Sequence, residues 1–523
     1  MADHSIWIPK HNPWAVALTV TLATFMEVLD TSIANVSLPH IAGNLSASEQ
    51  EATWVLTSYL VSNAIVLPMS AWLSRLIGRK RFYMMCVALF TCSRFLCGLA
   101  PSLGVLVIFR ILQGAGGGGL QPSEQAILAD TFPPSRRGMA FAVYGMAVVV
   151  APAIGPTLGG WITDNFSWRW IFYINVPIGM LSLFLTQRLV EDPPYLNEER
   201  ARGRVRIDYI GLSLLVLAVG CLQLVLDKGQ ENDWFGSTWI VVTLAVAVYA
   251  FVLWILWEWR HPQPIVNLRL FRHRNFATAM LFTFVLGIVL FGTTVIIPQF
   301  LQLLLGYPAQ LSGEALAGGG LIMLLMMPIA GFFVSRIDPR IMMAFGFWST
   351  AASLYFIATH LSLQMDFRTA FLLRTYQAMG LAFIFLPSNT LAYLGIPREN
   401  NNQISAMNSF VRNIGGSIGI AVITTFITRQ AQKHQNYMVS RAVSGNRAFD
   451  QLSAALRHNM LHQNQAHPGT EAYGRVMGLI QGQATTLAYI DVISIMAIVV
   501  ALLPPFILFM RRPKAAGAPA AMH

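Results

Sequence analysis

The chain has 523 residues, of which 55% are hydrophobic and 11% are charged, and its mean hydropathy is +0.55. A soluble globular protein carries about 25% charged residues, so this sequence lacks the charge to coat a water-soluble surface. The formal net charge of +11 does not indicate a nucleic-acid binder, because the basic residues lie in short loops between apolar runs. We therefore expect an all-α polytopic membrane protein with most of its surface against lipid.

Fourteen apolar runs are long enough to cross a bilayer as helices, which takes about 20 residues. The first contains Glu27 and Asp30 and ends without a small-residue cleavage site, so we interpret it as a spanning helix and not as a signal peptide. The thirteenth is the weakest, because Arg412 and Asn413 interrupt it. The expected spans are 14–38, 52–74, 82–100, 104–129, 138–163, 170–187, 208–226, 239–258, 276–304, 312–335, 341–360, 368–395, 403–428 and 485–510.

The basic residues of the short loops indicate the orientation of these spans. Loops after even-numbered spans are rich in Lys and Arg, whereas the alternate short loops hold only Arg169, Lys228 and Arg368. Basic loops remain in the cytoplasm, so we expect both termini there and an even number of spans. The long polar segment 429–484 is expected on the outer side, where long segments are exempt from the charge rule.

Two carboxylates in the first span are candidates for proton coupling, because ionisable groups inside a membrane are costly and usually functional. Glu27 and Asp30 are three residues apart, which places them within about 60° of each other on one helix face. Neighbouring carboxylates repel when both are charged, so such a pair is suited to binding a proton and releasing it when water or a cationic substrate arrives. The alternatives are a carboxylate that caps a helix break or one that pairs with a structural arginine.

The fourth span supplies the expected counter-charge. Arg110 keeps its proton and would hold a neighbouring carboxylate in the ionised form, while Gln113, one turn away, would orient it. A static ion pair that packs the bundle is the alternative. Two further intramembrane groups, Arg94 and Glu124, either join this machinery or lie near an interface with their charged ends toward the headgroups.

Glycine and proline residues in the fourth and fifth spans indicate close helix packing. The run from Gly114 to Gly119 has the spacing G-x-G-x-x-G, but no strand precedes it, so a nucleotide site is excluded and packing is the expected role. The spacing of the cysteines and histidines fits no metal site, and the chain has no P-loop. We expect no metal and no cofactor. The residues of the fifth span that predict a kink are Pro152, Gly155, Pro156, Gly159 and Gly160.

An internal repeat predicts two related halves. Residues 73–79 recur as 334–340, the motif Arg110-x-x-Gln113 recurs as Arg374-x-x-Gln377, and the glycines of 155–160 recur more weakly at 415–419. The repeat pairs the first six spans with the last six. We expect an N-terminal six-helix bundle in 1–190, a cytoplasmic linker and an inserted helix pair in 191–275, and a C-terminal six-helix bundle in 276–523 that includes the outer loop 429–484. A site between two such bundles, near the midplane, permits alternating access.

These motifs resemble those of the major facilitator superfamily, in particular its fourteen-span drug:proton antiporters of the EmrB/QacA type, over almost the whole chain. The loop motif after the second span retains Gly78, Arg79 and Lys80, but Arg75 stands where the family has an aspartate, and Ala71 replaces the first glycine. The carboxylate of the family's cytoplasmic latch is therefore expected to be absent. The motifs that carry the resemblance are Leu29–Pro39, Arg110–Gly114, Gly155–Gly160 and Trp168–Gly179.

The resemblance implies a secondary transporter, not an enzyme, that exports hydrophobic toxic compounds across the bacterial inner membrane against proton entry. Such exporters work with a periplasmic adaptor protein and an outer-membrane channel, and 429–484 is the expected adaptor contact. Export of an endogenous metabolite or siderophore is the alternative, whereas the Gly155-Pro156 motif argues against uptake by symport. The residues expected to contact substrate are Asn35, Tyr59, Asn63, Gln121, Arg374, Gln377 and Arg412.

Overall fold

The computed structural model describes residues 9–194, 196, 208–443, 445–462 and 468–510. Within these ranges the chain is helical and contains no strand. Thirteen described helices are long and apolar enough to cross a membrane, or fourteen when the bent helix α7 is counted as one span. The all-α, polytopic fold expected from hydropathy is confirmed.

The N-terminal bundle packs seven principal helices into six spans, because a break divides the fourth span into α5 and α6. Gly118 and Gly119 lie at this break, where an added Cβ would approach the backbone carbonyl oxygen of Asn63 and the side chain of Phe82. These glycines therefore allow close helix packing, as expected. The helices are α1 (Pro13–Asn44), α2 (Glu49–Ala52), α3 (Trp54–Ile77), α4 (Arg79–Leu99), α5 (Leu103–Gly117), α6 (Leu120–Thr131), α7 (Arg137–Asn165), α8 (Trp170–Tyr173) and α9 (Val176–Leu189).

Six long helices form the C-terminal bundle, in which α16 is a single unbroken helix, and two further helices lie between the bundles in the chain. The inserted pair is α11 (Tyr209–Lys228) and α12 (Thr238–Arg260), with a short 3₁₀ turn, η1 (Trp234–Gly236), between them. The C-terminal bundle consists of α13 (Arg274–Leu303), α14 (Ala309–Phe333), α15 (Pro339–His360), α16 (Phe367–Ala392), α17 (Asn401–Val439) and α19 (Pro468–Ala501), with the 3₁₀ turns η2 (Leu268–Arg272), η3 (Arg398–Asn400) and η4 (Pro504–Phe509).

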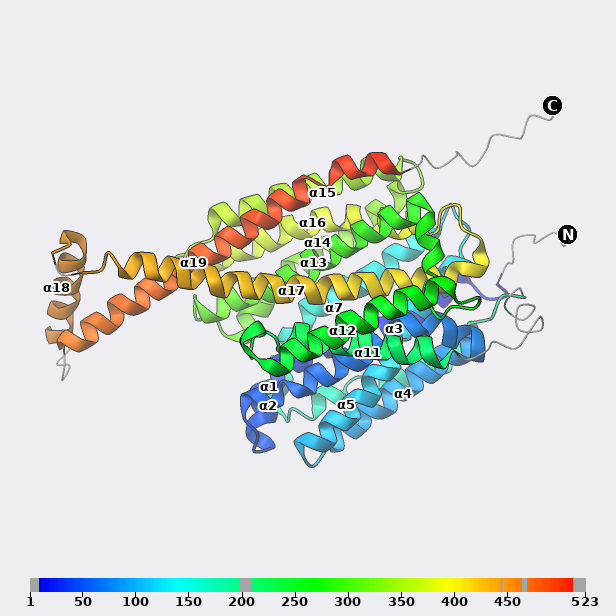
Figure 1. Ribbon diagram of the computed structural model, residues 1–523, viewed down its shortest axis with the longest axis horizontal. Coiled ribbons are helices and arrows are strands. Elements are labelled where there is room, and N and C mark those ends of the chain that lie inside the picture. The colour runs from blue at the N-terminus through cyan, green and yellow to red at the C-terminus, as the bar shows by residue number, and fades with distance from the viewer. Residues whose placement is uncertain (1–8, 195, 197–207, 444, 463–467, 511–523) are drawn as a thin grey trace.

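Helices α17 and α19 extend well beyond the other helices at one end of the molecule (Figure 1). Together with α18 (Arg447–His462) they form a protruding arm, and we call this end the arm end and the opposite one, where α1 begins, the terminal end. The segment 429–484 is therefore not a loop throughout, because residues 429–439 belong to α17 and residues 468–484 belong to α19. The thirteenth span, the weakest in the sequence, is one uninterrupted helix.

The inserted pair covers the seam between the two bundles. Helix α11 packs against α3 of the N-terminal bundle and α17 of the C-terminal bundle. At the arm end, the Lys228 ammonium group donates hydrogen bonds to Thr53 and, over 2.9 Å, to Glu231, and it lies 5.3 Å from the centre of the Trp54 ring. This polar contact anchors α11 to the start of α3.

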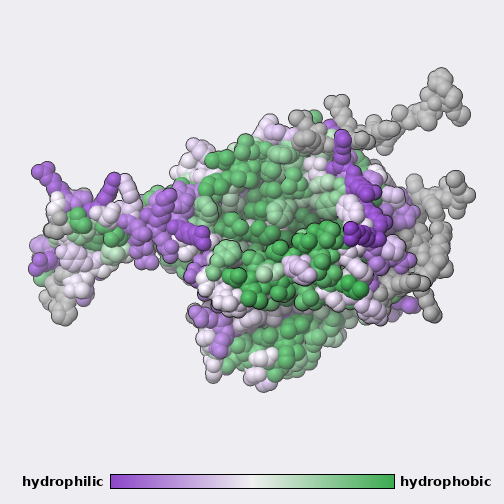
Figure 2. Space-filling model, in the orientation of Figure 1, coloured by the Kyte–Doolittle hydropathy of each residue, from purple (hydrophilic) through white to green (hydrophobic). Residues whose placement is uncertain are grey.

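The surface shows how the molecule meets a bilayer (Figure 2). In that view a broad hydrophobic region covers the middle of the helices, and hydrophilic residues gather on the arm and at the terminal end. Apolar side chains are also exposed on the inserted pair, such as Val242 and Val248. A hydrophobic belt between two polar ends is the surface that a lipid bilayer requires.

Candidate functional site

A buried ion cluster in the N-terminal bundle joins three helices. Asp30 of α1 accepts a hydrogen bond from Arg110 of α5 over 2.6 Å, and its other carboxylate oxygen lies 2.7 Å from a guanidinium nitrogen of Arg94 on α4. All three side chains are at most 2% exposed. The expected partnership of Asp30 with Arg110 is present, and Arg94 lies in the core instead of at an interface. Two guanidinium groups on one carboxylate favour its ionised form.

Residues of the fourth-span motif hold Arg110 in place. Its Nη1 donates to Gln113 Oε1 over 2.8 Å, and its Nε donates to the Val55 carbonyl oxygen over 2.9 Å. The guanidinium carbon lies 4.5 Å from the centre of the Tyr59 ring. Gly114 packs against the α3 backbone at Tyr59, where a Cβ would collide with it. Arg110 is therefore fixed by side-chain and backbone contacts of two helices.

Glu27 belongs to a different group from Asp30, which corrects the expectation of one carboxylate pair. Its Oε1 accepts from Asn63 of α3 over 3.1 Å. Glu124 of α6, which is fully buried, accepts from the Thr21 hydroxyl over 2.7 Å. Neither glutamate forms an ion pair with a described residue. Among these three carboxylates, Asp30 is paired with two arginines, whereas Glu27 and Glu124 accept hydrogen bonds from neutral groups.

Arg412 of α17 reaches from the C-terminal bundle to these residues. Its Nη2 donates to Gln121 of α6 and to the Tyr144 hydroxyl of α7, each over 2.6 Å. One turn toward the terminal end, Gln125 donates to Ser409 over 2.8 Å and accepts from Asn408 over 3.0 Å. These bonds form a cross-bundle network. The structure thus brings the predicted residues Gln121 and Arg412 together at the seam.

A second contact between the bundles lies at the terminal end and replaces the missing motif aspartate. Arg75 is exposed in the last turn of α3, whereas Arg79 is buried and pairs with Asp130 at the end of α6. The other oxygen of Asp130 accepts from Asn401 of α17 over 2.6 Å. Asp130, a carboxylate at the end of the fourth span, therefore connects the two bundles here in place of the missing motif aspartate. Gly78 permits the turn before Arg79 because its φ is +104°.

The Gly155-Pro156 motif places α7 directly against α1 beside the ion cluster. Proline has no backbone N–H, so Pro156 leaves the Pro152 carbonyl oxygen without its helical donor. The Ser32 hydroxyl supplies the missing hydrogen bond over 3.1 Å. A Cβ on Gly155 would collide with the Ser32 side chain. Gly159 of the same motif also packs on α1. The carbonyl oxygens of Gly159 and Gly160 both accept a hydrogen bond from the Thr163 hydroxyl.

The remaining predicted residues lie apart from these groups. Arg374 and Gln377 of α16 form a cluster with Thr293 and Thr294 of α13, inside the C-terminal bundle. Asn35 is exposed on α1 and makes no hydrogen bond to any of the clusters described above. No group of three or more His, Cys, Asp or Glu side chains in the described residues is arranged to hold a metal ion.

Sequence reasoning left the roles of Arg94 and Glu124 open and did not consider Asp130. For Arg94 and Glu124 the signal was a charged residue deep inside an apolar run, since such groups are rarely tolerated without a partner. Asp130 lies at the end of the fourth span and carries no such signal. All three side chains lie in the core of the protein and not at a membrane interface, because Arg94 and Glu124 are 0% exposed and Asp130 is 7% exposed.

Comparison with known proteins identifies the family. The family model described as the Major Facilitator Superfamily matches residues 20–420. The chain belongs to this superfamily. It is therefore a membrane transporter and not an enzyme, and its many spanning helices make it a multi-pass inner-membrane protein.

Several members of the superfamily are similar over most of their length. The chain is 38% identical to the multidrug export protein EmrB of Haemophilus influenzae, covering 88% of each protein. It is 39% identical to EmrB of Escherichia coli K12, covering 80% of this chain and 81% of that protein. The solved structure of the proton:xylose symporter XylE has a TM-score of 0.57 at 16% identity and covers 91% of this chain and 94% of that one. The likeness to XylE shows the shared fold alone.

Proposed function

We propose that this protein exports hydrophobic drugs and toxic compounds across the inner membrane in exchange for protons. The observation that carries the proposal is the set of buried carboxylates in the N-terminal bundle: Asp30 between two arginines, and Glu27 and Glu124 among neutral donors. Similarity to the EmrB multidrug export proteins over more than four-fifths of the chain supports export of drugs.

The two kinds of carboxylate suit different parts of a proton cycle. An unpaired ionised carboxylate is costly to bury, so Glu27 and Glu124 are suited to carrying a proton in this conformation. Asp30 remains charged while Arg94 and Arg110 contact it, and it can accept a proton only when those contacts loosen. Asp30, Glu27 and Arg110 are therefore the proposed coupling residues, and Glu124 joins them.

The proposed orientation places the terminal end in the cytoplasm. This end holds basic residues of the connections between spans, such as Arg136, Arg272 and Arg398, and basic loops remain in the cytoplasm. The arm would then extend into the periplasm. Hydrogen bonds across the seam near the terminal end would close the cytoplasmic side in this conformation.

Proton coupling is tested with purified protein in liposomes and an imposed pH gradient. Export of a lipophilic dye by the wild type should depend on the gradient, and Asp30→Asn should abolish gradient-driven export. Glu27→Gln should also lower it, because an amide cannot carry a proton. Equal dye movement with the gradient collapsed, or undiminished gradient-driven export by Asp30→Asn, contradicts the proposal.

We further propose that the arm contacts a periplasmic adaptor protein, which links the transporter to an outer-membrane channel. The arm is helical on both sides of α18 and lies clear of the bundles (Figure 1), so it presents a surface that the membrane does not cover. Replacing residues 440–467 with a short Gly/Ser linker should abolish co-purification with the adaptor and leave dye export in liposomes intact. Retained co-purification would show that the adaptor binds elsewhere.

A further inference from the structure

A connection rich in arginine joins the inserted pair to the C-terminal bundle at the terminal end. Segment 259–274 contains four arginines and no acidic residue. All four arginines are exposed, whereas Leu268 and Leu270 of η2 are buried. The turn therefore packs its leucines inward and presents its arginines at the terminal end, where hydrophilic residues border the hydrophobic belt (Figure 2). The arginines are Arg260, Arg269, Arg272 and Arg274.

Three of these arginines gather at one tryptophan in the last turn of α12. Arg269 Nη2 donates to the carbonyl oxygens of Trp259 over 3.3 Å and of His261 over 3.2 Å, which ties η2 to the end of α12. The guanidinium carbon of Arg272 lies 5.5 Å from the centre of the Trp259 ring. Arg260 follows Trp259 directly in the chain. We call Trp259, Arg260, Arg269 and Arg272 the basic cluster.

Among the described residues, no acidic side chain pairs with the basic cluster. Two carboxylates lie beside it, but Asp208 and Glu258 are only 6% and 1% exposed. Asp208 accepts a hydrogen bond from the Trp257 indole over 2.8 Å, and Glu258 accepts one from the Trp254 indole over 3.2 Å. The exposed positive charge of the basic cluster is therefore available to an external anion.

An apolar stripe of α12 leads from the basic cluster toward the arm end. Val248, Val252 and Leu256 precede Trp259 at intervals of four, four and three residues, which places all four side chains on one face of the helix. All four are exposed. This face of α12 therefore meets the acyl chains of the bilayer directly beside the guanidinium groups.

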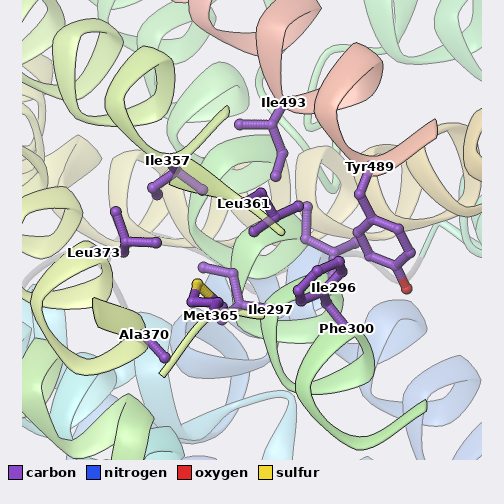
Figure 3. A pocket seen from close by; sticks show the side chains of 10 residues that line it. All are labelled: Ile296, Ile297, Phe300, Ile357, Leu361, Met365, Ala370, Leu373, Tyr489 and Ile493. Carbon is purple, nitrogen blue, oxygen red and sulfur yellow. The ribbon is translucent and has the colours of Figure 1, made fainter. Parts of the chain in front are cut away.

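An acyl chain has more room on this outer face than inside the C-terminal bundle. The apolar crevice between α13, α15, α16 and α19 (Figure 3) has space for about one water molecule. Side chains such as Phe300, Leu373 and Tyr489 close around it. The stripe on α12 has no such limit, because a chain that lies along it is covered by the surrounding lipid.

We infer that the basic cluster binds the phosphate of an anionic phospholipid whose acyl chain lies along the stripe of Val248, Val252 and Leu256. Guanidinium groups form charge-assisted, bidentate hydrogen bonds with phosphate oxygens. Clusters of Lys and Arg at the membrane surface attract anionic headgroups, and tryptophan is enriched at this depth. The inference is independent of the proposed export, because it assigns a bound membrane lipid and not a transported compound.

The position of the site connects lipid binding to the seam between the bundles. The backbone N–H of Asn267 donates to Gln403 of α17 over 3.2 Å, and Gln403 donates to the Ile265 carbonyl oxygen over 3.0 Å. Asn401, two residues before Gln403, donates to Asp130 across the seam. A lipid that holds η2 against α12 therefore also stabilises the start of α17, which contacts the N-terminal bundle.

The test measures binding of fluorescently labelled phosphatidylglycerol to the purified full-length protein in a non-ionic detergent at low ionic strength. Unlabelled phosphatidylglycerol should displace the probe. Phosphatidylcholine with the same acyl chains should bind at least about tenfold more weakly, because its headgroup has no net charge. Inorganic phosphate should not displace the probe at the concentrations at which phosphatidylglycerol does, because it has no acyl chain to bury.

The double variant Arg269→Gln, Arg272→Gln should weaken phosphatidylglycerol binding roughly 25-fold, about fivefold for each lost arginine. Arg272→Gln alone leaves the backbone hydrogen bonds of Arg269 in place and should weaken binding about fivefold. The matched control is the double variant Arg75→Gln, Arg81→Gln, which removes two exposed arginines from the terminal end of the N-terminal bundle. This control should bind phosphatidylglycerol as the wild type does.

Three results would overturn the lipid site. Equal affinities for phosphatidylglycerol and phosphatidylcholine would show that the basic cluster does not select charge. Equal losses in the two double variants would show that total charge matters and not this cluster. Displacement of the probe by inorganic phosphate at the concentration of the lipid would show that the stripe on α12 contributes nothing.

Discussion

Substitution of Asp30 by asparagine tests whether the ion cluster stabilises the N-terminal bundle. The change keeps the size of the side chain but removes its charge, so Arg94 and Arg110 lose the carboxylate that lies 2.7 Å and 2.6 Å from them. Both arginines are 0% exposed, and water cannot replace the lost partner without opening the bundle. The variant therefore has two buried cations that have lost the carboxylate they share.

The expected loss follows from these contacts. Removing one partner of a buried ion pair costs about 3–5 kcal/mol, and Asp30 is the shared partner of two cations. A unit of 150–250 residues loses about 2–4 °C of Tm for each kcal/mol. We expect the Tm of Asp30→Asn to fall by roughly 6–20 °C, because asparagine retains one acceptor oxygen but no charge.

Thermal unfolding of the detergent-solubilised protein measures this loss. Asp164→Asn is the matched control, since Asp164 forms a 3.8 Å ion pair with His40 in which both side chains are about half exposed or more. Exposed pairs contribute little to stability, so this variant should unfold at the temperature of the wild type. A fall of less than about 2 °C for Asp30→Asn, or equal falls for both variants, would refute the stabilising role of the cluster.

Three further predictions concern the helix contacts around the site. Gly155→Val should lower dye export at least about tenfold with normal membrane insertion, because its side chain would push Ser32 and α1 away from α7; wild-type export would contradict this packing. Asn401→Ala removes the hydrogen bond from α17 to Asp130. We expect the distance between spin labels on the two bundles at the terminal end to increase. An unchanged distance distribution would show that this hydrogen bond does not hold the two bundles together. Gly78→Ala should destabilise the protein by about 1–2 kcal/mol, since a φ of +104° is strained for alanine, and an unchanged Tm would be inconsistent with this turn.

The number of spans could be predicted because hydropathy accumulates over about 20 residues and the charge rule requires an even count. The partnership of Asp30 with Arg110 could be predicted because few charges lie inside the membrane and each needs compensation. The sequence could not separate Glu27 from Asp30. Their common helix face does not reveal that α3 offers one of them an amide, while α4 and α5 offer the other two guanidinium groups.

The contacts between the bundles could not be predicted for a related reason. Asp130 and Asn401 are 271 residues apart, and a local motif cannot show that they meet. Hydropathy detects where a helix leaves the membrane but not where it ends, so it could not show that the arm continues α17 and α19 as unbroken helices. The polar residues of α17 after position 428 continue the same helix, since residues such as Gln and Lys are good helix formers in water.

The length of α17 gives the arm a mechanical consequence. Its 39 residues span about 58 Å at 1.5 Å per residue, roughly twice the 30 Å thickness of the hydrocarbon core. The part outside the bilayer is therefore a stiff lever about 28 Å long. A tilt of the C-terminal bundle by about 10° would move its tip by roughly 5 Å, a displacement of about one helical turn. A protein bound at the tip would be displaced by this distance whenever the C-terminal bundle tilts during transport.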